Sequence, residues 1–234
     1  MSLIGSLKDF SLNEIPHDAL LQTENDTDIS HVQIKAKITY SIYDKDGRLI
    51  KKWTEPARSL TYWYALLEYN LWTQGTISMT DTSGTSITPY MGSPGTILVE
   101  AGSGITTYGI LVGSGNTSSV SQKSMMYNLI ALIPNGTSAG QLNYQNTTFT
   151  SPSVSGNTST WSFSRNFINQ SGGTITITEV GVVAMLSGFR LENSLSSALL
   201  TSDYFLIAYD IPSSAISLAN GQTLNITYTY QVVA

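Results

Sequence analysis

The sequence predicts a mainly β protein: a jelly-roll-like β-sandwich with one amphipathic helix and an N-terminal arm. Short runs in which apolar and polar residues alternate recur along the chain, and Gly- and Ser-rich breaks such as 102–104 and 113–115 separate them. One stretch, about 59–74, instead has the three-to-four-residue spacing of a helix. Many short strands with a single helix are typical of a β-sandwich or jelly roll.

Length and composition limit the number of domains and the kinds of partner that we expect. The 234 residues suffice for one large β domain, so we expect an arm over 1–30 and a single domain over 31–234. Only 12% of the residues are charged and the net charge is −5, which argues against a nucleic-acid partner. The chain has no cysteine, which excludes disulfides and thiolate chemistry.

Residues 1–30 are expected to form an arm or an irregular cap. Pro16 and the acidic stretch 24–28 stop any long helix, and such an arm usually packs on its own domain or on a neighbour. We expect no secretory signal, because MSLIGSLKDF has no basic region followed by an apolar one. No apolar run reaches the roughly 18 to 20 residues of a membrane span. The apolar residues of the arm are Leu3, Ile4, Leu7, Phe10 and Leu12.

The first expected strand covers residues 32–43, where apolar and polar side chains alternate. Asp44 to Gly47 then predicts a hairpin turn into 48–54, with Gly47 at positive φ. The turn resembles the start of a calcium loop, but the third acidic ligand and the distant glutamate are missing, so we expect no metal there. The expected inward side chains are Val32, Ile34, Ala36, Ile38, Tyr40 and Ile42.

The expected helix over about 59–74 begins at Ser59, a suitable N-cap, and ends before Gly75. One interpretation places its aromatic residues in the core of the sandwich. The other is a subunit interface, because Trp and Tyr are enriched in such surfaces. The expected inner face contains Leu60, Trp63, Tyr64, Leu67, Leu71 and Trp72. The interface candidates are Trp53, Trp63, Tyr64 and Trp72.

Strands are expected over most of the remaining chain. Residues 161–167 alternate, 169–173 (NQSGG) predicts a turn, and a second alternating run follows. We expect these two runs to pair as a β-hairpin whose apolar faces need an opposing sheet. Residues 190–201 are expected to form a short helix or a loop. The expected strands after the helix are 76–80, 96–99, 108–112, 125–130, 141–150, 161–167, 174–184, 204–209, 215–218 and 224–233.

The residues contain no catalytic constellation, so we expect no enzyme, no catalytic or cofactor-binding residue and no cofactor. Residues 113–115 (GSG) lack the lysine and helix of a phosphate loop, and no Gly-x-Ser-x-Gly elbow occurs. Glu179 and Asp210 are expected to be structural hydrogen-bond acceptors. The two histidines, His17 and His31, suggest no triad; a metal site with Asp18 or Asp28 is the minor alternative.

Asn-x-Ser/Thr sequons are in mild excess over the about four that composition predicts. They occur at Asn25, Asn116, Asn135, Asn146, Asn157, Asn169 and Asn225. Most lie in expected loops, where a glycan fits. The candidates for glycosylation are Asn116, Asn135, Asn146, Asn157 and Asn169.

Seven segments also occur in a distinctive order: YDKDG (43–47), ARSL (57–60), YGILVGSG (108–115), FINQSGG (167–173), ITEVGV (177–182), FLIAYD (205–210) and NGQTLNITY (220–228). In this order they resemble a loosely defined family of β-sandwich virion structural proteins from tailed phages and archaeal viruses. The resemblance covers most of the chain from Tyr43 onward. It implies a virion component and supplies no catalytic residue to carry over.

The leading hypothesis is therefore a virion structural protein of the capsid, a vertex turret or a decoration, located in the virion. Its expected partners are further copies of itself and other capsid or tail proteins. The alternative is a carbohydrate-binding module of a spike or tail that recognises host surface glycans, with Tyr90, Tyr127 or Tyr144 as stacking platforms. A glycosidase or depolymerase would require a cleft that holds two carboxylates.

Overall fold

The computed structural model describes residues 33–57, 60–73, 77–88, 96–115, 125–191 and 198–233. Within these ranges the protein has one helix and thirteen strands in several antiparallel sheets, so the predicted mainly β class is confirmed. The predicted arm over 1–30 lies outside the described residues.

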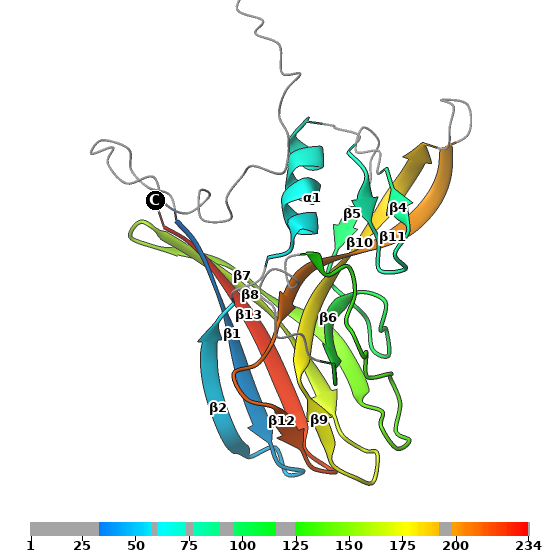
Figure 1. Ribbon diagram of the computed structural model, residues 1–234. Helices are drawn as coiled ribbons and strands as arrows, with labels where there is room; N and C mark the ends of the chain where they lie inside the picture. Colours follow the sequence, from blue (N-terminus) through cyan, green and yellow to red (C-terminus); the bar gives the residue numbers. More distant parts are fainter. Residues whose placement is uncertain are drawn as a thin grey trace, which may run out of the picture.

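The larger sheet has five antiparallel strands in the order β2-β1-β13-β8-β7 (Figure 1). β1 and β13 pair over their whole length, from Gln33 opposite Val233 to Tyr43 opposite Thr223. The first and last long strands are therefore neighbours at the centre of the sheet. The strands are β1 (Gln33–Tyr43), β2 (Leu49–Pro56), β7 (Asn143–Ser155), β8 (Thr158–Ile168) and β13 (Thr223–Val233).

The second sheet is built around β10 (Glu179–Leu191). On one side β10 pairs with β11 (Ala198–Asp210), and on the other it pairs with β6 (Gly109–Gly113) and β5 (Thr96–Leu98) in succession. β9 (Ile175–Ile177) and β12 (Ile216–Leu218) extend the same hairpin after a short break. A small hairpin joins β3 (Met79–Thr80) to β4 (Ser86–Ile87).

The two sheets face each other as two layers (Figure 1). Alternate residues of each strand point inward, and they form one hydrophobic core. Hydrogen bonds also join the layers: the Tyr228 hydroxyl on β13 lies 3.1 Å from Asp210 on β11, and the Tyr144 hydroxyl on β7 donates to the carbonyl of Ile133. The contacts between the layers are therefore both apolar and polar.

The predicted hairpin over 161–186 is wrong in its pairing. β8 pairs with β7 and β13 in the larger sheet, whereas β10 pairs with β11 and β9 pairs with β12. The turn at 169–173 therefore carries the chain from one layer to the other. The predicted alternation is confirmed, since Phe163, Arg165 and Phe167 are all buried. A period of two identifies the buried face of a strand but not its neighbour.

The helix α1 (Tyr62–Thr73) is shorter than predicted and packs mainly on β11. Trp63 and Leu67 are buried as expected, but Leu60 and Leu71 are 39% and 41% exposed, and Leu66 is buried instead. The segment 62–67 is apolar on every side, so its spacing does not select one face. The predicted N-cap Ser59 lies outside the described residues.

Contacts before the helix fix which face is buried. The backbone N–H of Thr61 donates to the carbonyl of Ile207, and its hydroxyl donates to the carbonyl of Leu206. Both acceptors lie on β11, so the first turn of α1 is tied to the edge of the second sheet.

Several predicted strand boundaries change. The strand expected at 76–80 is reduced to Met79–Thr80 among the described residues, and residues 125–130 form no strand. Ile34, expected inward, is 65% exposed, because that end of β1 extends beyond the core. Residues 190–201 were expected to form a helix or loop, but both ends of this segment belong to β10 and β11.

Buried tyrosines predict alkaline unfolding. Burial raises the pKa of Tyr40, Tyr144, Tyr209, Tyr228 and Tyr230 above the usual value of about 10. The unfolded chain loses these protons first, so stability is fully present below pH 10 and falls as the pH rises above it. We expect tyrosinate absorbance to rise together with loss of near-ultraviolet circular dichroism. Complete ionisation of the tyrosines in a chain that keeps its native spectrum would contradict this.

Candidate functional site

Three charged side chains are buried among the described residues, and each is a candidate for chemistry. Arg165 is 1% exposed, Glu179 0% and Asp210 5%. Their hydrogen-bond partners decide whether they are structural or free to react.

Glu179, at the start of β10, accepts four hydrogen bonds. Its Oε1 accepts from the backbone N–H groups of Gly115 and Ala131 at 3.1 and 2.7 Å. Its Oε2 accepts from the N–H of Ile130 at 2.9 Å and from the Tyr209 hydroxyl at 2.8 Å. The carboxylate therefore holds two loop segments against β10, and the structural role predicted for Glu179 is confirmed.

Glycines allow these loops to approach Glu179. A Cβ atom at Gly115 would lie 2.7 Å from Glu179 Oε1, and one at Gly113 would collide with the same carboxylate. The glycines of the GSG segment thus make room for a buried carboxylate, and the segment is not a phosphate loop.

Arg165, on β8, donates to four backbone carbonyls. Its Nε lies 2.7 Å from the carbonyl of Gln145, and its Nη1 lies 3.0 Å from that of Ile110. Its Nη2 donates to the carbonyls of Gly102 and Ile105 at 2.9 and 2.7 Å. Burial lowers the pKa of Arg165 to about 10, so the side chain is charged at neutral pH. With its donors directed at the backbone, Arg165 is structural.

Asp210 ends β11 beneath the larger sheet and accepts from the Tyr228 hydroxyl at 3.1 Å. Burial and the nearby Asp210 carboxylate raise the pKa of Tyr228. In the part of the chain that the structure describes, no three His, Asp or Glu side chains come together to hold a metal. Asp210 therefore makes a polar contact between the two layers.

The predicted interface residues differ in exposure. Trp63 is 7% exposed and its indole N–H donates to the carbonyl of Met126, so it belongs to the core and cannot contact a partner. Trp53 is half-buried and stacks on Tyr40 with ring centroids 5.0 Å apart, and its indole N–H donates to the Glu55 carboxylate. Tyr64 is half-buried, and burial together with Glu68 raises its pKa to about 12. The side chain of Trp72 lies outside the described residues.

An exposed apolar surface that the sequence did not predict lies at one end of the larger sheet. There the sheet diverges from β10 and β11 (Figure 1). Its inner face continues the core but is partly exposed: Phe149 is 46%, Ile34 65% and Val154 75% exposed. Trp161 stacks on Tyr230 with ring centroids 4.7 Å apart, and both are half-buried. We call these five residues the aromatic shelf.

The register shows that the shelf residues share one face. Phe149 lies opposite Phe163, and Tyr230 lies opposite Trp161. Val154 lies opposite Ser159 on the neighbouring strand. The same row across the sheet then continues through Val232 to Ile34. Phe149 stacks on Phe163, which is 2% exposed, so the shelf joins the core without a break. Sequence periodicity places these residues inward, but it gives no information on where the opposite layer ends.

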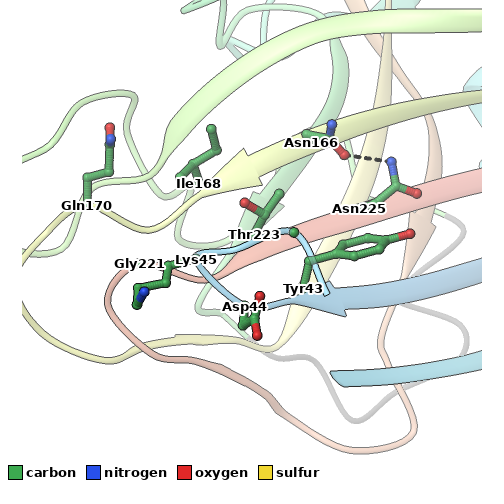
Figure 2. Close-up of a pocket in the computed structure, with 10 residues that line it drawn as sticks. Tyr43, Asp44, Lys45, Asn166, Ile168, Gln170, Gly221, Thr223 and Asn225 are labelled. Carbon is green, nitrogen blue, oxygen red and sulfur yellow. Dashed lines mark hydrogen bonds between the residues drawn. The ribbon is translucent and has the colours of Figure 1, made fainter. Parts of the chain in front are cut away.

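The outer face of the larger sheet is polar and mostly uncharged near its centre. Cross-strand hydrogen bonds join Thr39 to Thr54, Thr148 to Ser164, and Asn225 to Asn166. At the end nearest the 44–47 turn this face is hollowed by an open cleft of about 700 Å³ (Figure 2). Its lining includes Tyr43, Asn166, Ile168, Gln170, Thr223 and Asn225.

Asn169 was predicted as a glycosylation site, but it is 0% exposed. Its amide nitrogen donates to the carbonyls of Gly173 and Leu218 at 2.8 and 2.6 Å, and its Oδ1 accepts from Ser171. The folded chain therefore leaves no room for a glycan there, and Asn169 instead fixes the turn between the layers. Asn135, Asn146 and Asn157 are exposed, and Asn116 lies outside the described residues.

The predicted sugar-stacking tyrosines also differ from expectation. Tyr144 is 0% exposed and packs edge-on against Phe167, so it is not a platform for a sugar. Tyr127 is 45% exposed. Tyr90 lies outside the described residues.

Comparison of the chain with protein-family models, with curated sequences and with solved structures finds no match. No helix within the described ranges is long and apolar enough to cross a membrane.

The Glu179 contacts predict a large loss of stability on Glu179→Gln. The amide NH₂ would face two hydrogen-bond donors, so we expect the free energy of unfolding to fall by about 2 to 4 kcal/mol. Urea unfolding followed by tryptophan fluorescence measures this. Glu100→Gln is the matched control, because Glu100 is exposed; its effect should stay within about 0.5 kcal/mol. Equal effects of both changes would contradict the structural role of Glu179.

Asn169→Ala is expected to destabilise the fold by about 1 to 3 kcal/mol, since it removes the amide donor to the buried carbonyl of Leu218 and the acceptor of the Ser171 N–H. The exposed Asn146→Ala is the control and should be nearly neutral. Expression in a glycosylating host, followed by glycopeptide mass spectrometry, should find no glycan on Asn169 of the folded protein. A glycan on Asn169 in protein with a native spectrum would contradict this.

Proposed function

We propose that the protein is a virion structural protein, a capsid, vertex or decoration component that assembles through contacts between copies. The observation that carries the proposal is the aromatic shelf. Its apolar side chains continue the core, yet Phe149, Ile34 and Val154 are substantially exposed. Contiguous exposed apolar surface is typical of protein interaction sites. The resemblance to virion proteins of phages and archaeal viruses favours another virion protein as the partner.

The charge distribution favours close packing of copies. Net charge is small for 234 residues, and the centre of the outer face of the larger sheet is made of Thr, Ser and Asn pairs. Neutral polar surfaces avoid like-charge repulsion when many copies crowd together. The partners would be further copies of the chain and other capsid or tail proteins, and the location would be the virion.

The two edge strands of the larger sheet disfavour pairing with a strand of another copy, so contact between copies through a sheet face is favoured. β7, at one edge, contains Pro152 and two register shifts, and β2, at the other, carries Lys51 and Lys52. Proline, bulges and edge lysines all oppose the addition of another strand. Side-chain contacts at the shelf are therefore the preferred route of assembly.

For the shelf we propose one occupant, the apolar part of the N-terminal arm (Leu3 to Leu12) of a neighbouring copy. The arm joins β1 at Gln33, directly beside Ile34 of the shelf. The roughly 20 residues between Leu12 and Gln33 can span about 65 to 70 Å when extended. A tether of this length allows the arm to reach the shelf of a neighbouring copy.

The two facing layers would form a β-sandwich of a virion building block. A jelly roll remains a prediction for this chain. Jelly rolls are built from two Greek keys, whereas the hairpins β1–β2, β7–β8 and β10–β11 each stay within one sheet.

The double variant Phe149→Ser/Val154→Ser tests the shelf. We expect the wild-type chain to form oligomers in sedimentation equilibrium, and the variant to be monomeric with its native circular dichroism spectrum retained. Tyr127→Ser, at a 45% exposed tyrosine outside the shelf, is the control and should assemble like wild type. Deletion of residues 1–30 should have the same effect as the shelf variant.

Three results would overturn parts of this proposal. A wild-type chain that stays monomeric at high concentration, and is absent from purified particles by mass spectrometry, would overturn the virion role. Oligomers that survive the shelf variant would exclude the shelf. Oligomers that survive deletion of the arm but not the shelf variant would exclude the arm as the occupant.

A further inference from the structure

The open cleft on the outer face of the larger sheet has a fixed frame. Its floor belongs to the central strands β1, β13 and β8, which are hydrogen-bonded along their whole register. One rim is the 44–47 turn, where Asp44 Oδ1 accepts from the N–H groups of Asp46 and Arg48 at 2.9 Å each. Gly221 lies against this turn, since a Cβ atom there would be 3.6 Å from Lys45 Cβ, and its N–H donates to the carbonyl of buried Asn169. The lining side chains are therefore presented by rigid elements.

The cleft is lined by one acidic and one basic residue, Asp44 and Lys45, whose charges are opposite. Asp44 Oδ1 holds its own turn, and Lys45 Nζ pairs with Asp46 at 2.9 Å. The remaining polar lining groups are the amides of Asn166, Gln170 and Asn225 and the hydroxyls of Tyr43 and Thr223. A ligand with a strong charge would find no cluster of opposite charge here, so the chemistry favours a neutral polar ligand.

Amide groups in the cleft are available to such a ligand. Asn225 Nδ2 donates to Asn166 Oδ1 at 2.7 Å, and Gln170 Oε1 accepts from Asn143 at 3.1 Å. Within the described part of the chain, neither Asn166 Nδ2 nor Gln170 Nε2 has a hydrogen-bond partner. These bonds fix the oxygen side of both amides and leave two oriented donors exposed to a ligand.

An aromatic ring lines the same cleft as these donors. Figure 2 shows the Tyr43 ring next to Asn225, with Thr223 and Ile168 continuing the row across the strands. Tyr43, Thr223 and Ile168 are direct neighbours in the register, and all three are half-buried. The apolar C–H face of a sugar ring packs on such a surface, while its hydroxyls bond the amides.

From this combination we propose that the Tyr43 cleft binds a neutral oligosaccharide. Tyr43 and Ile168 provide the apolar platform, and Asn166 and Gln170 donate hydrogen bonds to sugar hydroxyls. Open clefts of this size accommodate small ligands. The site does not depend on the proposed assembly, because it occupies the outer face of the sheet and the aromatic shelf the inner face.

Isothermal titration with four neutral trisaccharides (maltotriose, cellotriose, mannotriose and chitotriose) tests the site, with sialyllactose as a charged probe. We expect at least one neutral trisaccharide to bind with a Kd of about 0.1 to 1 mM. Tyr43→Ala should weaken binding at least about tenfold, and Gln170→Ala by several-fold. Tyr127→Ala is the matched control, an exposed tyrosine elsewhere, and should bind like wild type. Native circular dichroism spectra would show that all variants fold.

Three results would overturn the site. They are binding by none of the neutral trisaccharides, binding by sialyllactose alone, and binding that survives Tyr43→Ala but not Tyr127→Ala. None of these results changes the expected oligomeric state, so a failed sugar site is distinguishable from failed assembly.

Discussion

The rest of this structure depends on a buried cation, Arg165, whose partners are backbone carbonyls. Removing a guanidinium from water costs several kcal/mol unless its donors are satisfied. Here four carbonyls satisfy it, and the Tyr144 ring packs against it with the guanidinium carbon 4.9 Å from the ring centroid. Three of those carbonyls belong to residues 102–110, so one side chain of the larger sheet holds a long segment of the opposite layer.

Glu179 complements Arg165 with the opposite charge. It accepts from loop N–H groups at 115, 130 and 131 and from Tyr209, as Arg165 donates to loop carbonyls. Together, the two side chains provide hydrogen-bond partners for backbone N–H and C=O groups in irregular segments, which form few strand-to-strand hydrogen bonds. The two layers are therefore held in a fixed arrangement, and this arrangement positions both proposed surfaces. Strand β8 connects the shelf, the core and the cleft, because it contains Trp161, Arg165 and Asn166, one in each.

Periodicity in the sequence predicted the β class, the helix, and the inward positions of Phe163, Arg165 and Phe167. It could not predict that the turn at 169–173 changes layers, because strand pairing depends on contacts far apart in the chain. Asn169 illustrates the same limit: a sequon in a Gly- and Ser-rich turn is typical of an exposed loop, yet tertiary contacts bury it. The shelf and the cleft were also missed. The shelf depends on where the opposite layer ends, and the cleft depends on which strands lie side by side in the larger sheet.

Urea unfolding of Arg165→Met and Arg165→Lys measures how far this cation holds the two layers together. Methionine fills a similar volume without donors, and lysine keeps the charge but has a compact head that cannot reach four divergent carbonyls. We expect both variants to lose at least about 3 kcal/mol of unfolding free energy, with lysine giving little rescue. A loss below about 1 kcal/mol for Arg165→Met would contradict the claim that this cation holds the two layers together.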